Sequence, residues 1–249
     1  MRTIAFTNHK GGTGKTTTTV NVGAGLQQLG KKVLLIDLDP QAHLTISLGI
    51  PADDLSATAY DLLKGTKKAE EVIYQRGGLD VVPSSLNLSG AQTHLANKRG
   101  SEYLLREALS AIKGYNFILI DCPPSLGLLT LNALCASKEV FVPIQVEFLA
   151  LHGISQLLEV IEVTRCRLNQ DLLITGVIAT RVDTRKILNR EVLRAVKDSF
   201  KDKVYKTFIR ENICLAEAPS AGKTIFEYKP TCYGAEDYNK LCLEILERE

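Results

Sequence analysis

The chain has 249 residues, of which 45% are hydrophobic, and this is enough to bury one sizeable α/β core. No apolar stretch is long enough to cross a bilayer, which argues against a membrane-spanning helix. The six cysteines form no Cys-x-x-Cys pair and no signal peptide is recognisable, so we expect reduced thiols in the cytoplasm. The formal net charge is only +2, but the basic residues are unevenly distributed.

Strand-like apolar runs alternate with longer helical patterns along the whole chain. The predicted strands cover residues 3–7, 33–37, 79–82, 117–120, 140–144, 173–179 and 204–209. This alternation predicts an α/β fold with a doubly wound, mostly parallel sheet and helices on both faces. Because no long Pro/Gly/Ser linker, low-complexity tract or internal repeat interrupts it, we expect residues 1–249 to form a single domain.

A glycine-rich run directly follows the first predicted strand. It consists of Lys10, Gly11, Gly12, Thr13, Gly14, Lys15, Thr16 and Thr17. Glycines allow a tight turn that directs backbone N–H groups at phosphate oxygens, and the following helix N-terminus adds partial positive charge. We expect Lys15 to reach the β- and γ-phosphates of a nucleoside triphosphate and the Thr16 hydroxyl to bind Mg²⁺. The alternative is an ordinary glycine-rich turn with a surface lysine.

Lys10 places a second lysine at the start of this run. With it, the run resembles the deviant phosphate loop (deviant Walker A motif) of the ParA/MinD ATPases, a branch of the P-loop NTPases. The resemblance implies that the whole run binds ATP, and that Lys10 crosses a homodimer interface to the partner's nucleotide. A cation suits that place, because a triphosphate enclosed between two subunits is a dense and poorly hydrated negative charge. The alternative is that Lys10 is a solvated loop lysine.

Two later predicted strands end in aspartates. Residues 33–41 include Asp39, residues 117–124 include Asp121, and both segments resemble signatures of the same family. The resemblance assigns Asp39 to the attacking water and the Mg²⁺ shell, and Asp121, in the Walker B strand, to a water on Mg²⁺. The alternative is that Asp39 caps the next segment, since Asp-Pro is a turn signal. Residues 141–145 and 215–220 also match the ParA (Soj-like) branch, so the resemblance runs from residue 2 to about residue 246.

Positive charge is concentrated between residues 181 and 210, where ten Lys or Arg residues face four Asp or Glu residues. Four of the basic residues have helical spacing and are expected along one helix face: Arg190, Arg194, Lys197 and Lys201. Such a stripe can contact a phosphate backbone without reading sequence, although a solvated helix face is the alternative. The family resemblance favours non-specific DNA binding, and Arg185 matches one of the family's DNA-contacting arginines.

Residues 209–212 depart from the family pattern. The family has an Ile-Pro-Arg-Asn segment here, whereas this chain has Ile209, Arg210, Glu211 and Asn212, with a glutamate in place of the arginine. Arg210 lies where the family's proline borders the adenine, so its assignment to adenine or to DNA stays open. Asn212 still matches a nucleotide-contact position.

The resemblance implies an ATP-dependent partitioning ATPase. ATP and Mg²⁺ would favour a nucleotide-sandwich homodimer that binds double-stranded DNA non-specifically and segregates chromosome or plasmid DNA. Lys10, Lys15 and Asp39 would be catalytic, and hydrolysis would be slow until a ParB-like partner stimulates it. The protein would be cytoplasmic and associated with the nucleoid. Because the first strand directly follows Met1, no N-terminal helix-turn-helix is expected.

Other functions of the same fold stay open. A MinD-like regulator or another cargo-positioning ATPase is one, although a MinD-like membrane helix would be basic and residues 236–249 are acidic. An iron-protein-like metabolic ATPase would need paired cysteines around a cluster, and the surroundings of Cys122 and Cys135 do not match that family. A nucleotide-stabilised scaffold without turnover is a further alternative.

Overall fold

The computed structural model describes residues 1–52, 54–96, 98–147 and 154–248. Within these residues, seven strands form one sheet in the order β3-β4-β2-β5-β1-β6-β7. The strands are β1 Arg2–Phe6, β2 Val33–Asp37, β3 Tyr74–Arg76, β4 Leu79–Val82, β5 Phe117–Asp121, β6 Glu139–Gln145 and β7 Leu173–Thr180. All neighbouring strands pair in parallel except β3 and β4. The predicted doubly wound, mostly parallel sheet is confirmed.

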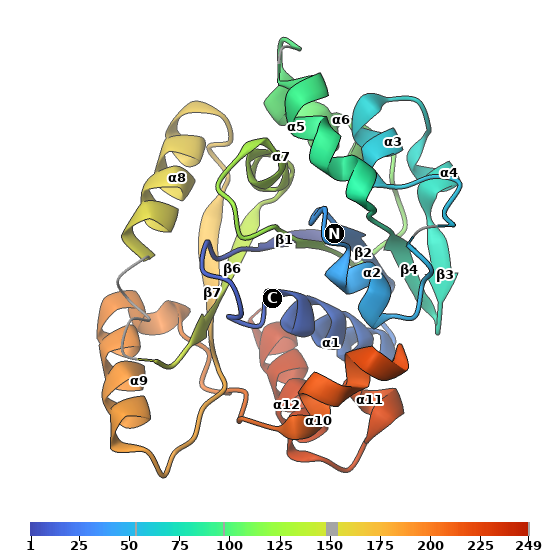
Figure 1. Cartoon of the computed structure of the whole chain (residues 1–249). Coiled ribbons are helices and arrows are strands. Elements are labelled where there is room, and N and C mark those ends of the chain that lie inside the picture. The colour runs from blue at the N-terminus through green and yellow to red at the C-terminus, as the bar shows by residue number, and fades with distance from the viewer. Residues whose placement is uncertain (53, 97, 148–153, 249) are drawn as a thin grey trace.

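Helices cover both faces of this sheet (Figure 1). They are α1 Lys15–Gln28, α2 His43–Ser47, α3 Ala59–Lys64, α4 Ala69–Val72, α5 Ser89–Leu95, α6 Leu104–Leu109, α7 Leu128–Ala136, α8 Ile154–Arg167, α9 Ile187–Phe200, α10 Ile213–Glu217, α11 Ile225–Tyr228 and α12 Tyr233–Glu247. Short 3₁₀ segments occur at Leu86–Leu88, Ser101–Tyr103, Lys201–Lys203 and Ala218–Ala221. In the part of the chain that the structure describes, no helix is long and apolar enough to cross a bilayer.

Successive side chains of the central strands point to opposite faces of the sheet, so the hydrophobic core has two parts, one on each face. In β2, Leu34 and Ile36 belong to the core cluster that includes residues of α3, α6, α7 and α8, whereas Leu35 belongs to the other cluster, with residues of α1 and α12. The α1 helix lies so close to β2 that a Cβ on Gly23 would come within 2.6 Å of a Leu35 methyl carbon. This close contact fixes α1, and with it the glycine-rich loop, against the centre of the sheet.

The strand predicted at residues 204–209 is wrong. Tyr205 and Ile209 donate backbone hydrogen bonds to β7, but the segment forms only an isolated bridge at Val204, and a second one follows it at Arg210. Between them, the backbone N–H groups of Lys206 and Thr207 donate to the Glu244 carboxylate of α12, at 2.8 and 2.9 Å. Successive N–H groups of a strand point to opposite sides, so at most one of these two donors could face β7. Both bind a side chain instead, and no continuous ladder forms. The short β3 strand, which the sequence did not predict, joins β4 through a turn at Gly77 and Gly78, both with positive φ.

The register of the central strands brings their carboxyl ends together. Phe6 of β1 and Asp37 of β2 both pair with Asp121 of β5. The glycine-rich loop after β1 and the aspartates at the ends of β2 and β5 therefore meet at one edge of the sheet, where ligands bind in open parallel α/β sheets.

Candidate nucleotide-binding site

The loop between β1 and α1 has the geometry of an anion cradle. Gly12 and Gly14 adopt φ values of 76° and 84°, which side chains rarely permit, so glycine is required at both positions. The α1 helix begins at Lys15, and no side chain caps it. The N–H groups of its first turn are thus available to phosphate oxygens, and the positive end of the helix dipole points at the same place.

The two lysines of the loop have different surroundings. Lys15 is buried, burial lowers the pKa of its ammonium group, and its Nζ atom donates to the Lys10 carbonyl oxygen at 3.3 Å. The Lys10 side chain is 36% exposed, and its Nζ atom lies 3.1 Å from the carboxylate of Glu147, just beyond β6. The loop thus has one inward cation for a bound phosphate and one at its rim.

Asp121 provides the buried carboxylate that a Mg²⁺ site requires. Its Oδ2 atom accepts the Thr16 hydroxyl at 2.6 Å, and its Oδ1 atom lies 3.4 Å from the Thr19 hydroxyl. Burial, and then the nearby Asp37 carboxylate, raise the pKa of Asp121 to about 8. The buried Asp121 carboxylate is costly to ionise without a counter-ion. Together with the Thr16 hydroxyl it offers the oxygen ligands that a hard divalent cation prefers. Two of the three residues predicted to bind Mg²⁺, Thr16 and Asp121, are therefore brought into contact here.

The two aspartates at the end of β2 serve different purposes. Asp37 is completely buried and accepts the backbone N–H and the hydroxyl of Thr45 at 2.9 and 2.7 Å; burial raises its pKa to about 6. Asp39 accepts the backbone N–H of Gln41 through Oδ1 at 2.9 Å, as the turn alternative expected. Its Oδ2 atom has no partner among the described residues, so the turn leaves one oxygen for a water molecule.

A cavity of about 430 Å³ opens beside the glycine-rich loop. Gly12, Gly14 and Thr17 line it on one side and residues 209–213 on the other, with further contributions from Thr180, Arg181, Leu215, Ala216 and Tyr238. Asn212 lines it too; its Oδ1 atom caps α10 by accepting the Cys214 N–H at 2.9 Å. An apolar cavity of this size that adjoins an anion cradle can hold a nucleoside.

Arg210 lines this cavity, but acidic residues of α12 bind its guanidinium group. Its guanidinium bonds the Asp237 carboxylate at 2.6–3.0 Å and Glu236 at 2.8 Å, and stacks 4.2 Å from the ring centre of Tyr233. These acidic partners raise the pKa of Arg210 further. A guanidinium held in this way is a weaker candidate for DNA than for the wall of the nucleoside cavity.

The predicted basic stripe lies on α9, apart from its last member. Arg190, Arg194 and Lys197 are exposed on this helix and have no ion-pair partner among the described residues. Lys201 lies beyond the helix, which ends at Phe200, and its φ of 52° turns the chain away, so the expected four-residue helix face is wrong at this residue. Arg185, just before α9, is 89% exposed and bound to Asp183.

The sequence did not predict the ion pairs beside this stripe. Arg181, Asp183, Lys186 and Glu211 form ion pairs between the cavity wall and the start of α9. Glu211 was noted only as a departure from the family pattern, and its pairing with Arg181 joins residues 30 positions apart, so no local spacing indicates it.

Comparison with known proteins gives full-length matches. A family model described as an AAA domain matches residues 1–174. The chain is 48% identical to the sporulation initiation inhibitor protein Soj of Bacillus subtilis, over 97% of both chains. It is 44% identical to the chromosome partitioning protein ParA of Caulobacter vibrioides, over 100% of this chain and 95% of that protein. Among solved structures it resembles cobyrinic acid a,c-diamide synthase from Mycobacterium smegmatis with bound ATP analog and magnesium, with 35% identity, a TM-score of 0.89 and coverage of 100% and 95%.

Proposed function

The chain belongs to the ParA/Soj family of deviant Walker A ATPases, and on that premise we propose that it is an ATP-dependent partitioning ATPase that segregates chromosome or plasmid DNA. One observation carries the proposal: the same chain has an anion cradle with two lysines and an exposed basic helix whose cations have no carboxylate partner among the described residues. The names of Soj and ParA, to which the chain is 48% and 44% identical, support the partitioning role.

Mg²⁺ would supply positive charge that stabilises the transferring phosphoryl group of ATP. Within this chain, Lys15 neutralises phosphate charge from inside the loop, and Thr16 with Asp121 would hold the cation. Asp39 orients the attacking water through the carboxylate oxygen that has no partner among the described residues. Residues 11–17 of the loop bind the phosphates, while Asn212 and the aliphatic part of Arg210 border the base.

Lys10 acts across a homodimer interface. Its position at the exposed rim of the loop supports this, because a second protomer closing over the nucleotide would meet that rim. In the closed dimer, Lys10 of each protomer neutralises the triphosphate bound by the other protomer, so nucleotide binding and dimerisation depend on each other.

DNA is the polyanion that the dimer binds. Arg185, Arg190, Arg194, Lys197 and Lys201 contact phosphates without reading sequence, and two such surfaces on one dimer raise avidity. A ParB-like protein stimulates the slow hydrolysis and so releases the dimer from the nucleoid. Membrane attachment through α12 is disfavoured, since its Tyr238, Leu241 and Ile245 side chains are buried in the core.

Two substitutions separate ATP binding from ATP hydrolysis. Lys15→Ala should abolish ATP binding and, with it, ATP-dependent DNA binding. Asp39→Ala should still bind ATP and DNA but hydrolyse ATP at least about a hundredfold more slowly, as expected when a water-positioning group is lost. Filter binding to random-sequence duplex DNA with ATP, ADP or no nucleotide, and phosphate release, measure both. Normal hydrolysis by Asp39→Ala, or equal DNA binding in all nucleotide states, would contradict the proposal.

A further inference from the structure

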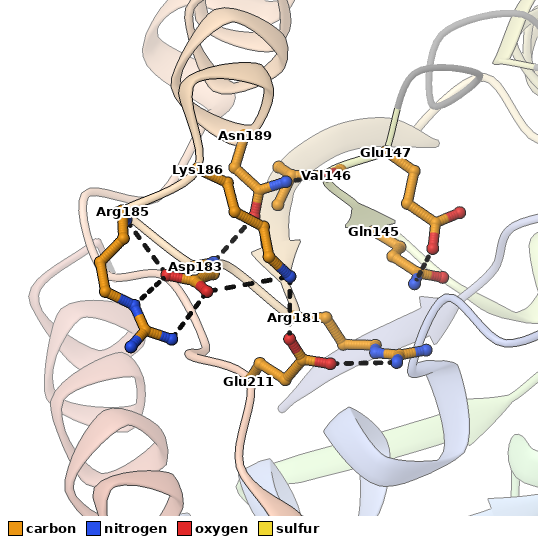
Figure 2. A network of polar contacts seen from close by, with 9 residues as sticks. All are labelled: Gln145, Val146, Glu147, Arg181, Asp183, Arg185, Lys186, Asn189 and Glu211. Carbon is orange, nitrogen blue, oxygen red and sulfur yellow. Dashed lines mark hydrogen bonds and ion pairs between the residues drawn. The ribbon is translucent and has the colours of Figure 1, made fainter.

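Arg185 and Lys186, the two cations nearest the start of α9, are held by carboxylates of the same chain (Figure 2). Asp183 accepts the Arg185 side chain through both oxygens, with Nε and one Nη atom each at 2.9 Å, and also accepts the Arg185 backbone N–H at 3.1 Å. This two-point contact is the geometry with which a guanidinium binds a phosphate group.

Glu211 holds the second cation and extends the network to the nucleotide cavity. One of its oxygens lies 3.2 Å from Arg181 and the other lies 3.5 Å from the Nζ atom of Lys186. Asp183 lies 3.8 Å from the same Nζ atom. Lys186 is therefore placed between two carboxylates, one of which belongs to the wall of the cavity.

Buried contacts fix the position of this network. Asn189, which is 7% exposed, accepts the Asp183 backbone N–H and donates to the Val146 carbonyl oxygen, both at 2.8 Å (Figure 2). The Asp183 side chain is only 12% exposed, although its Arg185 partner is 89% exposed. The Asp183 backbone is thus anchored to α9 and, through Asn189, to the residue that follows β6, while the Arg185 side chain stays at the surface.

The cations further along α9 differ from these two. Arg190, Arg194 and Lys197 are exposed, with no carboxylate partner in the described part of the chain. The basic surface therefore has two parts: an open part on α9, and a part next to the nucleotide cavity that is already neutralised from within.

We propose that Asp183 and Glu211 form an internal anionic mask over Arg185 and Lys186, and that DNA phosphates must displace this mask before those two cations can bind. The open cations of α9 make the first contact, and the masked pair adds to it only when a phosphate replaces the carboxylates. A single protomer thus binds DNA weakly, and firm retention requires the surfaces of two. The inference rests on the proposed function in taking DNA as the polyanion.

Two Glu→Gln variants, one inside the network and one outside it, test the proposed mask. Glu211→Gln keeps the shape of the side chain and removes its charge, and Glu191→Gln removes the same charge from an exposed residue of α9 outside the network. In the absence of nucleotide, Glu211→Gln should bind a random-sequence duplex about three- to tenfold more tightly than Glu191→Gln. Its plot of log affinity against log salt should also be steeper, by up to about 0.9 for one additional phosphate contact. Equal affinities and slopes for the two variants would overturn the mask.

Asp183→Asn gives a second reading of the same contact. An asparagine oxygen still accepts the Arg185 backbone N–H, so the loop keeps its support while the charge is lost. Tighter DNA binding supports masking, whereas weaker binding means that Asp183 positions Arg185 for DNA and overturns it.

Arg194→Glu separates the proposed DNA-binding function from the proposed mask. If it leaves DNA binding unchanged, the α9 surface and the mask both fail; if it weakens binding while Glu211→Gln matches Glu191→Gln, only the mask fails.

Discussion

Asp121 is the residue at which stability and function conflict most directly. Its folded pKa of about 8 lies far above the ordinary value of 3.8, so between these pH values the folded chain keeps a proton that the unfolded chain has released. The free energy of unfolding therefore falls as pH rises through this range. Asp37, with a pKa raised to about 6, contributes in the same direction at the lower end. Near neutral pH, the nucleotide-free protein therefore has a lower free energy of unfolding than it has in acid.

Asp121→Asn should remove most of that dependence. Without nucleotide or Mg²⁺, the variant should melt several degrees higher than wild type at pH 8, and this difference should shrink steadily as pH falls to about 4, because asparagine needs no proton to remain buried. It should lose ATPase activity, since the group that holds the cation's water is gone. Melting curves across this pH range check it, and parallel curves for the two proteins would contradict the role of the buried carboxylate.

At the scale of elements, α12 is joined to the cavity wall by Arg210. Its guanidinium reaches Asp237, whose side chain is only 6% exposed, and its backbone N–H donates to the same carboxylate at 2.9 Å. The substitution Arg210→Ala leaves that buried charge without its cation. We expect the free energy of unfolding to fall by about 2–3 kcal/mol.

Urea denaturation measures this loss. Arg190→Ala is the control, since Arg190 is an exposed arginine without a partner among the described residues, and its stability should stay within about 0.5 kcal/mol of wild type. If the two variants are equally stable, Arg210 does not hold α12 in place. A destabilised Arg210→Ala that keeps its DNA affinity would also favour the nucleoside cavity over DNA as the place of Arg210.

The elements also show how far the sequence can be interpreted. Apolar runs predicted six of the seven strands, because the strands of a parallel sheet are buried on both faces and form continuous hydrophobic segments. The run at 204–209 looked the same, but two of its backbone N–H groups bind the Glu244 carboxylate on a distant helix, which the sequence does not show. Helical spacing placed Arg190, Arg194 and Lys197 on one helix but could not show that the helix ends before Lys201.

At the scale of the whole molecule, contiguous motifs could be predicted and distant pairings could not. The glycine-rich loop follows from local spacing. The rule that parallel strands share a carboxyl edge brings Asp121 to that loop but does not give its hydrogen bond with Thr16. The pairing of Lys10 with Glu147, and of Glu211 with Arg181 and Lys186, depends on which loops the fold brings together. No periodicity encodes such pairs. The contacts of Glu211 are nevertheless the ones that link the cavity wall to the basic surface.

The most direct test of the proposed ATP-dependent homodimer is its mass in solution. With Mg²⁺ and a non-hydrolysable ATP analogue, wild type should sediment as a dimer and Lys10→Ala as a monomer, while both bind the nucleotide. The reason is that the interface loses the cation that each protomer contributes to the other's triphosphate. A Lys10→Ala protein that dimerises as readily as wild type, or a wild type that stays monomeric with bound nucleotide, would contradict the proposed role of this lysine.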